Sequence, residues 1–92
     1  MIGIFGAGVV GSRVAESLSL NLQTEIGVFD SSQIIAQRLA RRLHLTNSNI
    51  SAVDENKINS SKVVVIAGPS PHTEIARAFL EKKISVVSTS DD

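Results

Sequence analysis

The chain has 92 residues, of which 42% are hydrophobic, and its nine basic residues balance nine acidic ones. This length fits a single small domain, and the charges form no basic face of the kind that a nucleic-acid partner requires. The sequence has no cysteine and no apolar run of about eighteen residues, so we expect a cytoplasmic protein with no disulfide, no thiolate metal site and no membrane partner.

The first predicted element is a buried strand of a parallel sheet, the apolar run from Met1 to Phe5. Next comes Gly6-Ala7-Gly8-Val9-Val10-Gly11, which has the spacing G-x-G-x-x-G. A helix is predicted from about Val9 to Leu20, fading at Asn21. Its apolar stripe is expected to consist of Val10, Val14, Leu18 and Leu22. The glycines therefore fall at a strand-to-helix turn, the context in which this motif indicates a dinucleotide site.

Each glycine of the motif has a predicted role. Gly6 allows a tight turn, Gly8 leaves room for a pyrophosphate, and Gly11 lets the helix pack against the strand. The free N–H groups at the helix start, together with the helix dipole, favour an anion there. The whole motif is therefore a candidate cofactor site: Gly6, Ala7, Gly8, Val9, Val10 and Gly11.

A second strand is predicted over Thr24–Phe29, and it ends in Asp30, nineteen residues after Gly11. An acid at this place can accept hydrogen bonds from an adenosine ribose, so Asp30 and the adjoining Ser31 are candidate cofactor contacts. The structural alternative is that Asp30, Ser31 or Ser32 caps the next helix. A carboxylate here repels a 2′-phosphate, which favours NAD as the cofactor, with NADP as the second choice.

The middle of the chain has weaker signals. A second helix is predicted after Ser32, with an apolar face made of Ile35, Ala36, Leu39, Ala40 and Leu43. Arg38, Arg41 and Arg42 form the densest basic cluster, and we interpret them as the solvated face of this helix rather than as a 2′-phosphate site. Residues 50–53 could form a short edge strand, and residues 54–61 one helical turn or a loop.

The clearest buried strand is Lys62–Ala67, which leads into Gly68-Pro69-Ser70-Pro71. Gly68 and Pro69 are further candidate cofactor contacts, because this loop borders the expected crevice. Ser70 is predicted as a helix N-cap with Pro71 as the first helical residue. The apolar face of that helix is expected to consist of Ile75, Ala76, Phe79 and Leu80. Lys82 and Lys83 close it without a glycine, and Ile84–Ser88 is the last strand.

This alternation of strands and helices predicts an α/β fold, a Rossmann-type doubly wound parallel sheet in the order 3-2-1-4-5. The cofactor crevice should lie where the order reverses, between the first and fourth strands. We expect one small domain over residues 1–92 that stops after the fifth strand.

Few side chains in the sequence suggest chemistry. His72 is predicted to be an exposed histidine of a first helical turn, with proton transfer as the minor alternative. His44 receives no role. The residues at the end of the last strand and after it could line the nicotinamide or substrate side, or form a frayed tail: Ser88, Thr89, Ser90 and Asp91. The sequence contains no metal-ligand cluster and no Ser-His-Asp arrangement, so neither a metalloenzyme nor a hydrolase is predicted.

With these residues in place, the chain resembles the N-terminal NAD(P)-binding domain of saccharopine dehydrogenase-like proteins. The resemblance is loose between about residues 47 and 61. It rests on the glycine motif, Asp30, and the segments Val63–Pro69, Ile75–Ala78 and Val86–Asp92. Glucose-fructose-type oxidoreductases have a similar proline-rich turn before an Ile-Ala helix. Members of that family usually continue after the fifth strand with Glu-Lys-Pro, which this sequence lacks, so the saccharopine-type family is favoured.

The resemblance implies an NAD(P)-dependent oxidoreductase that acts on amino-acid-like substrates. Family members carry a further domain for substrate binding and much of the catalysis, which is missing here. We therefore expect the cofactor domain of a longer enzyme, or a stand-alone binding module, with a dinucleotide and that missing domain as partners. No catalytic residue is assigned, and homo-oligomer formation is left open.

Two other hypotheses remain at this point. An NAD-sensing regulatory module of the kind that gates potassium transport shares the glycine motif and the acid after the second strand. Such sensors usually have a different loop where this chain has Gly68-Pro69-Ser70-Pro71, so the oxidoreductase is favoured. The last hypothesis is a scaffold that keeps the fold and binds nothing.

Overall fold

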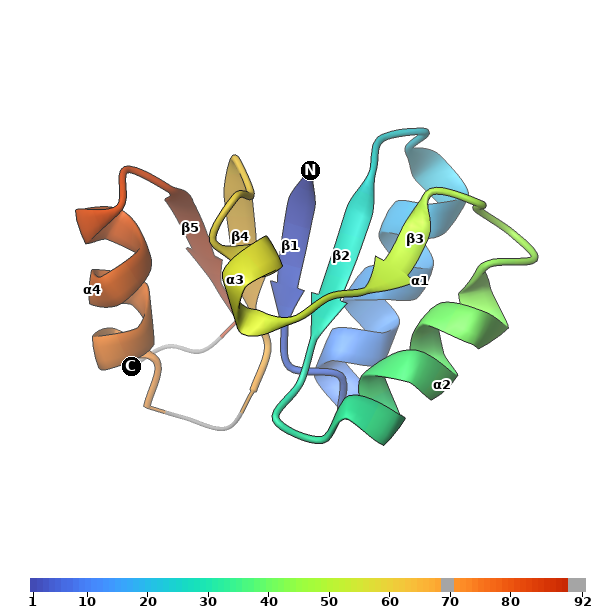
Figure 1. Cartoon of the computed structure of the whole chain (residues 1–92), viewed down its shortest axis with the longest axis horizontal. Helices are drawn as coiled ribbons and strands as arrows, with labels where there is room; N and C mark the ends of the chain where they lie inside the picture. The colour runs from blue at the N-terminus through green and yellow to red at the C-terminus, as the bar shows by residue number, and fades with distance from the viewer. Residues whose placement is uncertain (69–70, 90–92) are drawn as a thin grey trace.

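The structure is a computed structural model that describes residues 1–68 and 71–89. Its strands are β1 (Ile2–Phe5), β2 (Ile26–Phe29), β3 (Ile50–Ala52), β4 (Val63–Ile66) and β5 (Ser85–Ser88). They form one parallel sheet in the order β3-β2-β1-β4-β5, which confirms the predicted Rossmann-type topology (Figure 1). β1 is the central strand, with Gly3 opposite Gly27 of β2 on one side and Val64 of β4 on the other.

Four helices within the described residues cover the sheet, namely α1 (Val9–Asn21), α2 (Gln33–Leu43), α3 (Glu55–Ile58) and α4 (Thr73–Glu81). α1 and α2 pack together on one face, and α3 and α4 pack on the other (Figure 1). Successive strand residues alternate between these faces, so that Ile4 packs with the α1–α2 side and Phe5 with the α3–α4 side.

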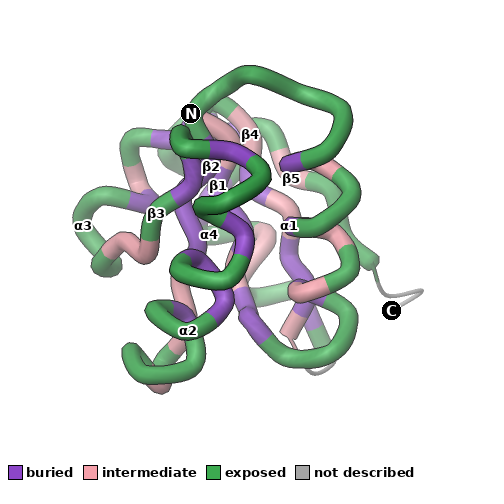
Figure 2. The backbone as a smooth tube through the Cα atoms, turned by 90° about the vertical axis from the view of Figure 1, so that its right-hand side faces the viewer, coloured by how far each residue is buried: buried purple, intermediate pink, exposed green. Residues whose placement is uncertain are grey.

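The buried residues gather along the strands and the inner sides of the helices (Figure 2). Most of the large ones are β-branched aliphatic residues, and each contributes about 1.5–3 kcal/mol by leaving water. Two aromatic contacts add to the α3–α4 side, because the Phe5 ring lies 5.0 Å from Phe29 and 5.7 Å from Phe79. Gly27 is closely approached, since a Cβ there would lie 2.7 Å from Met1 Sδ.

The apolar stripe predicted for α1 is wrong by one position, although the bounds of the helix are right. Val10 and Leu22 are 47% and 38% exposed, and Val14 and Leu18 are only partly buried. The buried residues of this helix are instead the small ones, Gly11, Ala15 and Ser19. Small side chains let α1 lie close to the sheet, so the larger residues are pushed to its flanks.

The predictions for the middle of the chain are largely confirmed. β3 is an edge strand, and α3 is a single turn whose N-cap Asp54 accepts a hydrogen bond from Lys57 N–H at 2.7 Å. Ser32 is the N-cap of α2, but its side chain makes no capping bond. Ile35 is 45% exposed, so it lies outside the buried face that was predicted to include it.

The arginines of α2 are all exposed, as predicted. One of them, Arg42, forms an ion pair with Glu16 of α1 at 3.6 Å, with both side chains more than half exposed. Such a pair stabilises a protein by about 1 kcal/mol at most. The cluster is therefore a solvated helix face.

α4 begins later than the sequence predicts. Its N-cap is His72, and Pro71 lies before the helix rather than at its first position. Ser70, the predicted cap, lies outside the described residues. Phe79 is the buried residue of this helix, whereas Leu80 is 57% exposed and does not belong to the buried face. α4 thus buries a narrower stripe than its apolar residues suggest.

The end of α4 is a Schellman motif built without glycine. Ile84 N–H donates to Phe79 O at 3.1 Å, and Lys83 N–H donates to Leu80 O at 2.9 Å. Lys83 has φ +63°, the left-handed conformation that a Cβ disfavours. Ile84 and Phe79 also pack in the same core cluster, and this contact stabilises the motif despite the unfavourable conformation of Lys83.

We expect Lys83→Gly to raise the free energy of unfolding by about 0.5–1 kcal/mol, because relief of the left-handed strain exceeds the entropy that glycine loses on folding. Urea denaturation measures the change. Lys82→Gly is the matched control, since Lys82 has φ −89° and gains no relief. Equal stabilisation by both substitutions would contradict the strain argument.

Candidate dinucleotide site

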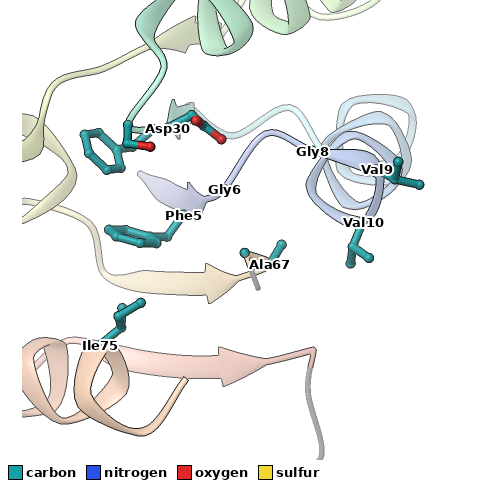
Figure 3. A pocket seen from close by; sticks show the side chains of 11 residues that line it. Phe5, Gly6, Gly8, Val9, Val10, Asp30, Ala67 and Ile75 are labelled. Atoms are coloured by element: carbon teal, nitrogen blue, oxygen red, sulfur yellow. The ribbon is translucent and has the colours of Figure 1, made fainter. Parts of the chain in front are cut away.

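A cavity of about 570 Å³ opens where β1 and β4 end, at the predicted switch point of the sheet (Figure 3). This volume lies in the range of small-molecule sites. Figure 3 shows Asp30 on one side of the turn at Gly6, and Ala67 and Ile75 on the other. The cavity is thus enclosed by the ends of β1, β2 and β4 and the first turns of two helices.

The three motif glycines differ in what surrounds them. Gly6 has φ +112°, and a Cβ there would lie 2.7 Å from Gly68 N, so the tight turn requires glycine. A Cβ on Gly11 would overlap the Gly6 carbonyl oxygen, so α1 lies directly against the turn. A Cβ on Gly8 would have nothing within 4 Å. Gly8 is therefore not required by packing, and it borders the open cavity.

The start of α1 presents free donors to this cavity. Its first ladder bond runs from Ser12 N–H to Gly8 O at 2.8 Å. The N–H groups of Val9, Val10 and Gly11 come before that bond and have no acceptor within the helix. No side chain of the described residues caps α1, and its first turn holds no acid. Val9 and Val10 line the cavity, so their amides and the helix dipole can bind an anion there.

The Asp30 carboxylate joins two turns at the cavity. Its Oδ2 accepts a hydrogen bond from Ala7 N–H, and its Oδ1 accepts one from Ser32 N–H, both at 2.8 Å. Each carboxylate oxygen has a second lone pair and can accept another hydrogen bond. Asp30 therefore lines the cavity with acceptor capacity remaining, while it holds the glycine turn in place.

Most of the predicted contacts line the cavity. They are Gly6, Gly8, Val9, Val10, Asp30, Ser31 and Gly68. Ala7 and Gly11 are buried and do not line it, since Ala7 is held by Asp30 and Gly11 packs on Gly6. Pro69 lies outside the described residues.

The sequence analysis missed the remaining residues of the lining, which are all apolar: Phe5, Phe29, Ala67 and Ile75. The first three of these residues directly precede predicted contacts, at the ends of their strands or just past them. Their positions could therefore have identified them as lining residues, because the carboxyl ends of parallel strands border the ligand crevice.

His72 is not the exposed residue that the sequence predicts. It is 1% exposed, and its two ring nitrogens are both hydrogen bonded. His44, by contrast, is exposed and follows α2, with Nδ1 3.3 Å from Ile50 O.

Neither Ser88 nor Thr89 lines the cavity. Thr89 binds back to the sheet, where its N–H and its Oγ1 both donate to Ile66 O at 3.1 and 3.0 Å. Ser90 and Asp91 lie outside the described residues. In the part of the chain that the structure describes, no cluster of three potential metal ligands occurs, and no helix is long and apolar enough to cross a membrane.

Residues 1–88 match GFO_IDH_MocA, the oxidoreductase family with an NAD-binding Rossmann fold. The chain belongs to this oxidoreductase family. No relative among curated proteins matches it. The GFO_IDH_MocA match covers every described element, from β1 to the end of β5.

Solved structures of dehydrogenases share the fold. Quinate dehydrogenase from Corynebacterium glutamicum, in complex with NAD, is 31% identical over 74% of this chain and 26% of its own, with a TM-score of 0.64. Minor L-lactate dehydrogenase from Enterococcus mundtii is 16% identical over 96% of this chain and 37% of its own (TM-score 0.74). A 3-hydroxyacyl-CoA dehydrogenase from Archaeoglobus fulgidus is 16% identical over 98% and 33% (TM-score 0.73). The chain therefore spans about a quarter to a third of the length of these enzymes.

The family is the glucose-fructose type that the sequence analysis ranked second. The comparisons give no support to the saccharopine dehydrogenase-like resemblance. The missing Glu-Lys-Pro motif had argued against the right family, yet the family match ends at residue 88, where β5 ends. The motif was expected after that point, so its absence said little about the matched domain.

The second and third glycines of the motif are predicted to differ in how much their substitution lowers stability. We expect Gly11→Ala to lower the free energy of unfolding by at least about 2 kcal/mol, because the methyl group meets backbone that cannot move away. Gly8→Ala should cost under about 1 kcal/mol, since only N-cap preference is lost. Denaturant titration of both variants checks this, and equal costs would show that α1 does not rest on Gly6 as described.

Proposed function

We propose that this domain binds NAD with its diphosphate on the first turn of α1 and its adenosine ribose on Asp30. The support is the combination of free α1 amides, the open side of Gly8 and a carboxylate in one cavity. A helix N-terminus favours the diphosphate, and the carboxylate favours ribose hydroxyls. The apolar lining, which includes Phe5, Phe29 and Ile75, suits the flat faces of the bases.

The preference for NAD over NADP rests on charge. Asp30 is half-buried in the lining, and Ser31 and Ser32 follow it where an arginine would serve a 2′-phosphate. The exposed arginines of α2 do not line the cavity. The Asp30 carboxylate would repel a 2′-phosphate placed beside it, and the repulsion is stronger because the site is partly desolvated.

We further propose that the domain serves a longer oxidoreductase. When bound, the nicotinamide supplies hydride transfer, while this chain's residues bind and orient the cofactor. The family match does not support the saccharopine-type subtype or the amino-acid-like substrate class that this resemblance implies. The NAD-sensor alternative is not favoured, since the structural relatives described above are dehydrogenases.

Calorimetric titration with NADH and NADPH tests the cofactor site. We expect the chain to bind NADH more tightly than NADPH. Asp30→Ala should weaken NADH binding by at least about tenfold, because hydrogen bonds to a charged group are lost. NADPH binding should fall less, because the repulsion of its 2′-phosphate is removed as well.

Asp54→Ala is the matched control for that experiment. Asp54 also follows a strand and bonds a main-chain N–H at a helix start, but it does not line the 570 Å³ cavity. Its loss should leave NADH affinity unchanged. Equal losses in both variants would contradict the ribose role, and no binding of either dinucleotide to the wild-type chain would leave only the scaffold hypothesis.

A further inference from the structure

His72 has the lowest exposure of the buried polar side chains in the described residues, at 1%. Its Nε2 lies 2.6 Å from Gly68 O, and its Nδ1 lies 2.7 Å from Ser88 Oγ. The ring therefore connects the backbone just after β4 with the end of β5. Neither the family assignment nor the proposed ribose and diphosphate contacts give this residue a role.

The Gly68 carbonyl fixes one hydrogen atom on the ring. A carbonyl oxygen only accepts, so Nε2 carries a hydrogen and donates it to Gly68 O. In the neutral ring Nδ1 is then an acceptor, and the Ser88 hydroxyl donates to it. His72 also caps α4, because its own carbonyl accepts Ala76 N–H at 2.8 Å. The side chain and main chain of one residue thus hold three elements together.

Gly68 connects the hydrogen bonds of His72 to the cavity. It lines the cavity, and nothing would lie within 4 Å of a Cβ on it, so its free side is open. Its backbone nitrogen would lie 2.7 Å from a Cβ on Gly6, so Gly68 abuts the first glycine of the motif. The position of the Gly68 peptide therefore determines where this part of the cavity wall lies. It also limits the conformation of the Gly6 turn, which leads to the α1 amides.

We propose that His72 is a positioning residue for the dinucleotide site. By holding the Gly68 carbonyl, it fixes the cavity wall against Gly6 before a diphosphate-bridged dinucleotide binds. It acts through Gly68 and does not line the cavity itself. This role rests on the proposed function, and it adds the end of β5 to the parts that determine cofactor affinity.

Two substitutions distinguish the effects of the two hydrogen bonds that the His72 ring makes. The amide nitrogen of His72→Gln stands as many bonds from Cβ as Nε2 does, so it can still donate to Gly68 O. The amide oxygen of His72→Asn takes the place of Nδ1, so it can accept from Ser88 but does not reach Gly68. His44→Gln is the control, because His44 also places a ring nitrogen near a main-chain carbonyl, far from the cavity.

Dissociation constants for NADH are measured by calorimetry at a temperature where every variant is folded, as checked by circular dichroism. We expect His72→Asn to weaken binding by about tenfold, and His72→Gln by less than about threefold. His44→Gln should bind as the wild type does. A merely structural role of the buried ring predicts similar losses for the two His72 variants, so equal losses would overturn the positioning role.

Nuclear magnetic resonance gives a second readout that needs no ligand. The ring ¹⁵N signals of His72 should show the Nε2–H tautomer, and the Gly6 and Gly68 amide signals should move further in His72→Asn than in His72→Gln. Unchanged glycine signals, or wild-type NADH affinity in His72→Asn, overturn the positioning role alone. A wild-type chain that binds no dinucleotide overturns the proposed function and this role with it.

Discussion

The close approach of α1 to the turn at Gly6 is the constraint on which this domain depends. A Cβ on Gly11 would overlap the Gly6 carbonyl oxygen, so the helix can start there only with glycine at that position. Because α1 lies this close, it buries the small residues Ala15 and Ser19 against the sheet rather than its valines and leucines. The same placement brings the unpaired amides of its first turn to the end of β1, beside the cavity. The packing of α1 and the position of its free amides thus have one geometric cause.

Asp30 adds a second constraint, and it acts before any ligand arrives. Its carboxylate accepts hydrogen bonds from Ala7 and from Ser32, which joins the β1–α1 turn to the β2–α2 turn. Hydrogen bonds to charged groups contribute about 1.5–3 kcal/mol each, more than an exposed ion pair such as Arg42 with Glu16. The carboxylate is therefore a structural link that also lines the cavity and has lone pairs left to accept further hydrogen bonds. Such a site is preorganised, which lowers the entropy lost on binding.

Elements that carry a strong local signal could be predicted from the sequence, and contacts between distant segments could not. The strand order followed from the alternation of apolar runs and helical periods, and the bounds of α1 were right because its start is fixed by the glycine motif. The prediction of the buried face of α1 was wrong because hydrophobicity favours valine over Gly11 at a buried position, whereas close packing against the sheet selects small residues. His72 was misjudged because its partner Ser88 lies sixteen residues further on, and only the fold shows that β4 and β5 end side by side.

The site combines two halves, each held by one side chain. Asp30 joins the turns after β1 and β2, and His72 joins the segments after β4 and β5. The halves meet where Gly6 abuts Gly68, beside a main-chain bond from Ala67 N–H to Phe5 O at 2.9 Å. Both halves line the cavity, so in the proposed binding mode a dinucleotide would contact both, and its affinity would depend on how firmly each is held. The glycine motif and its acid describe only the first half, whereas the second depends on a histidine that no short motif of this sequence identifies.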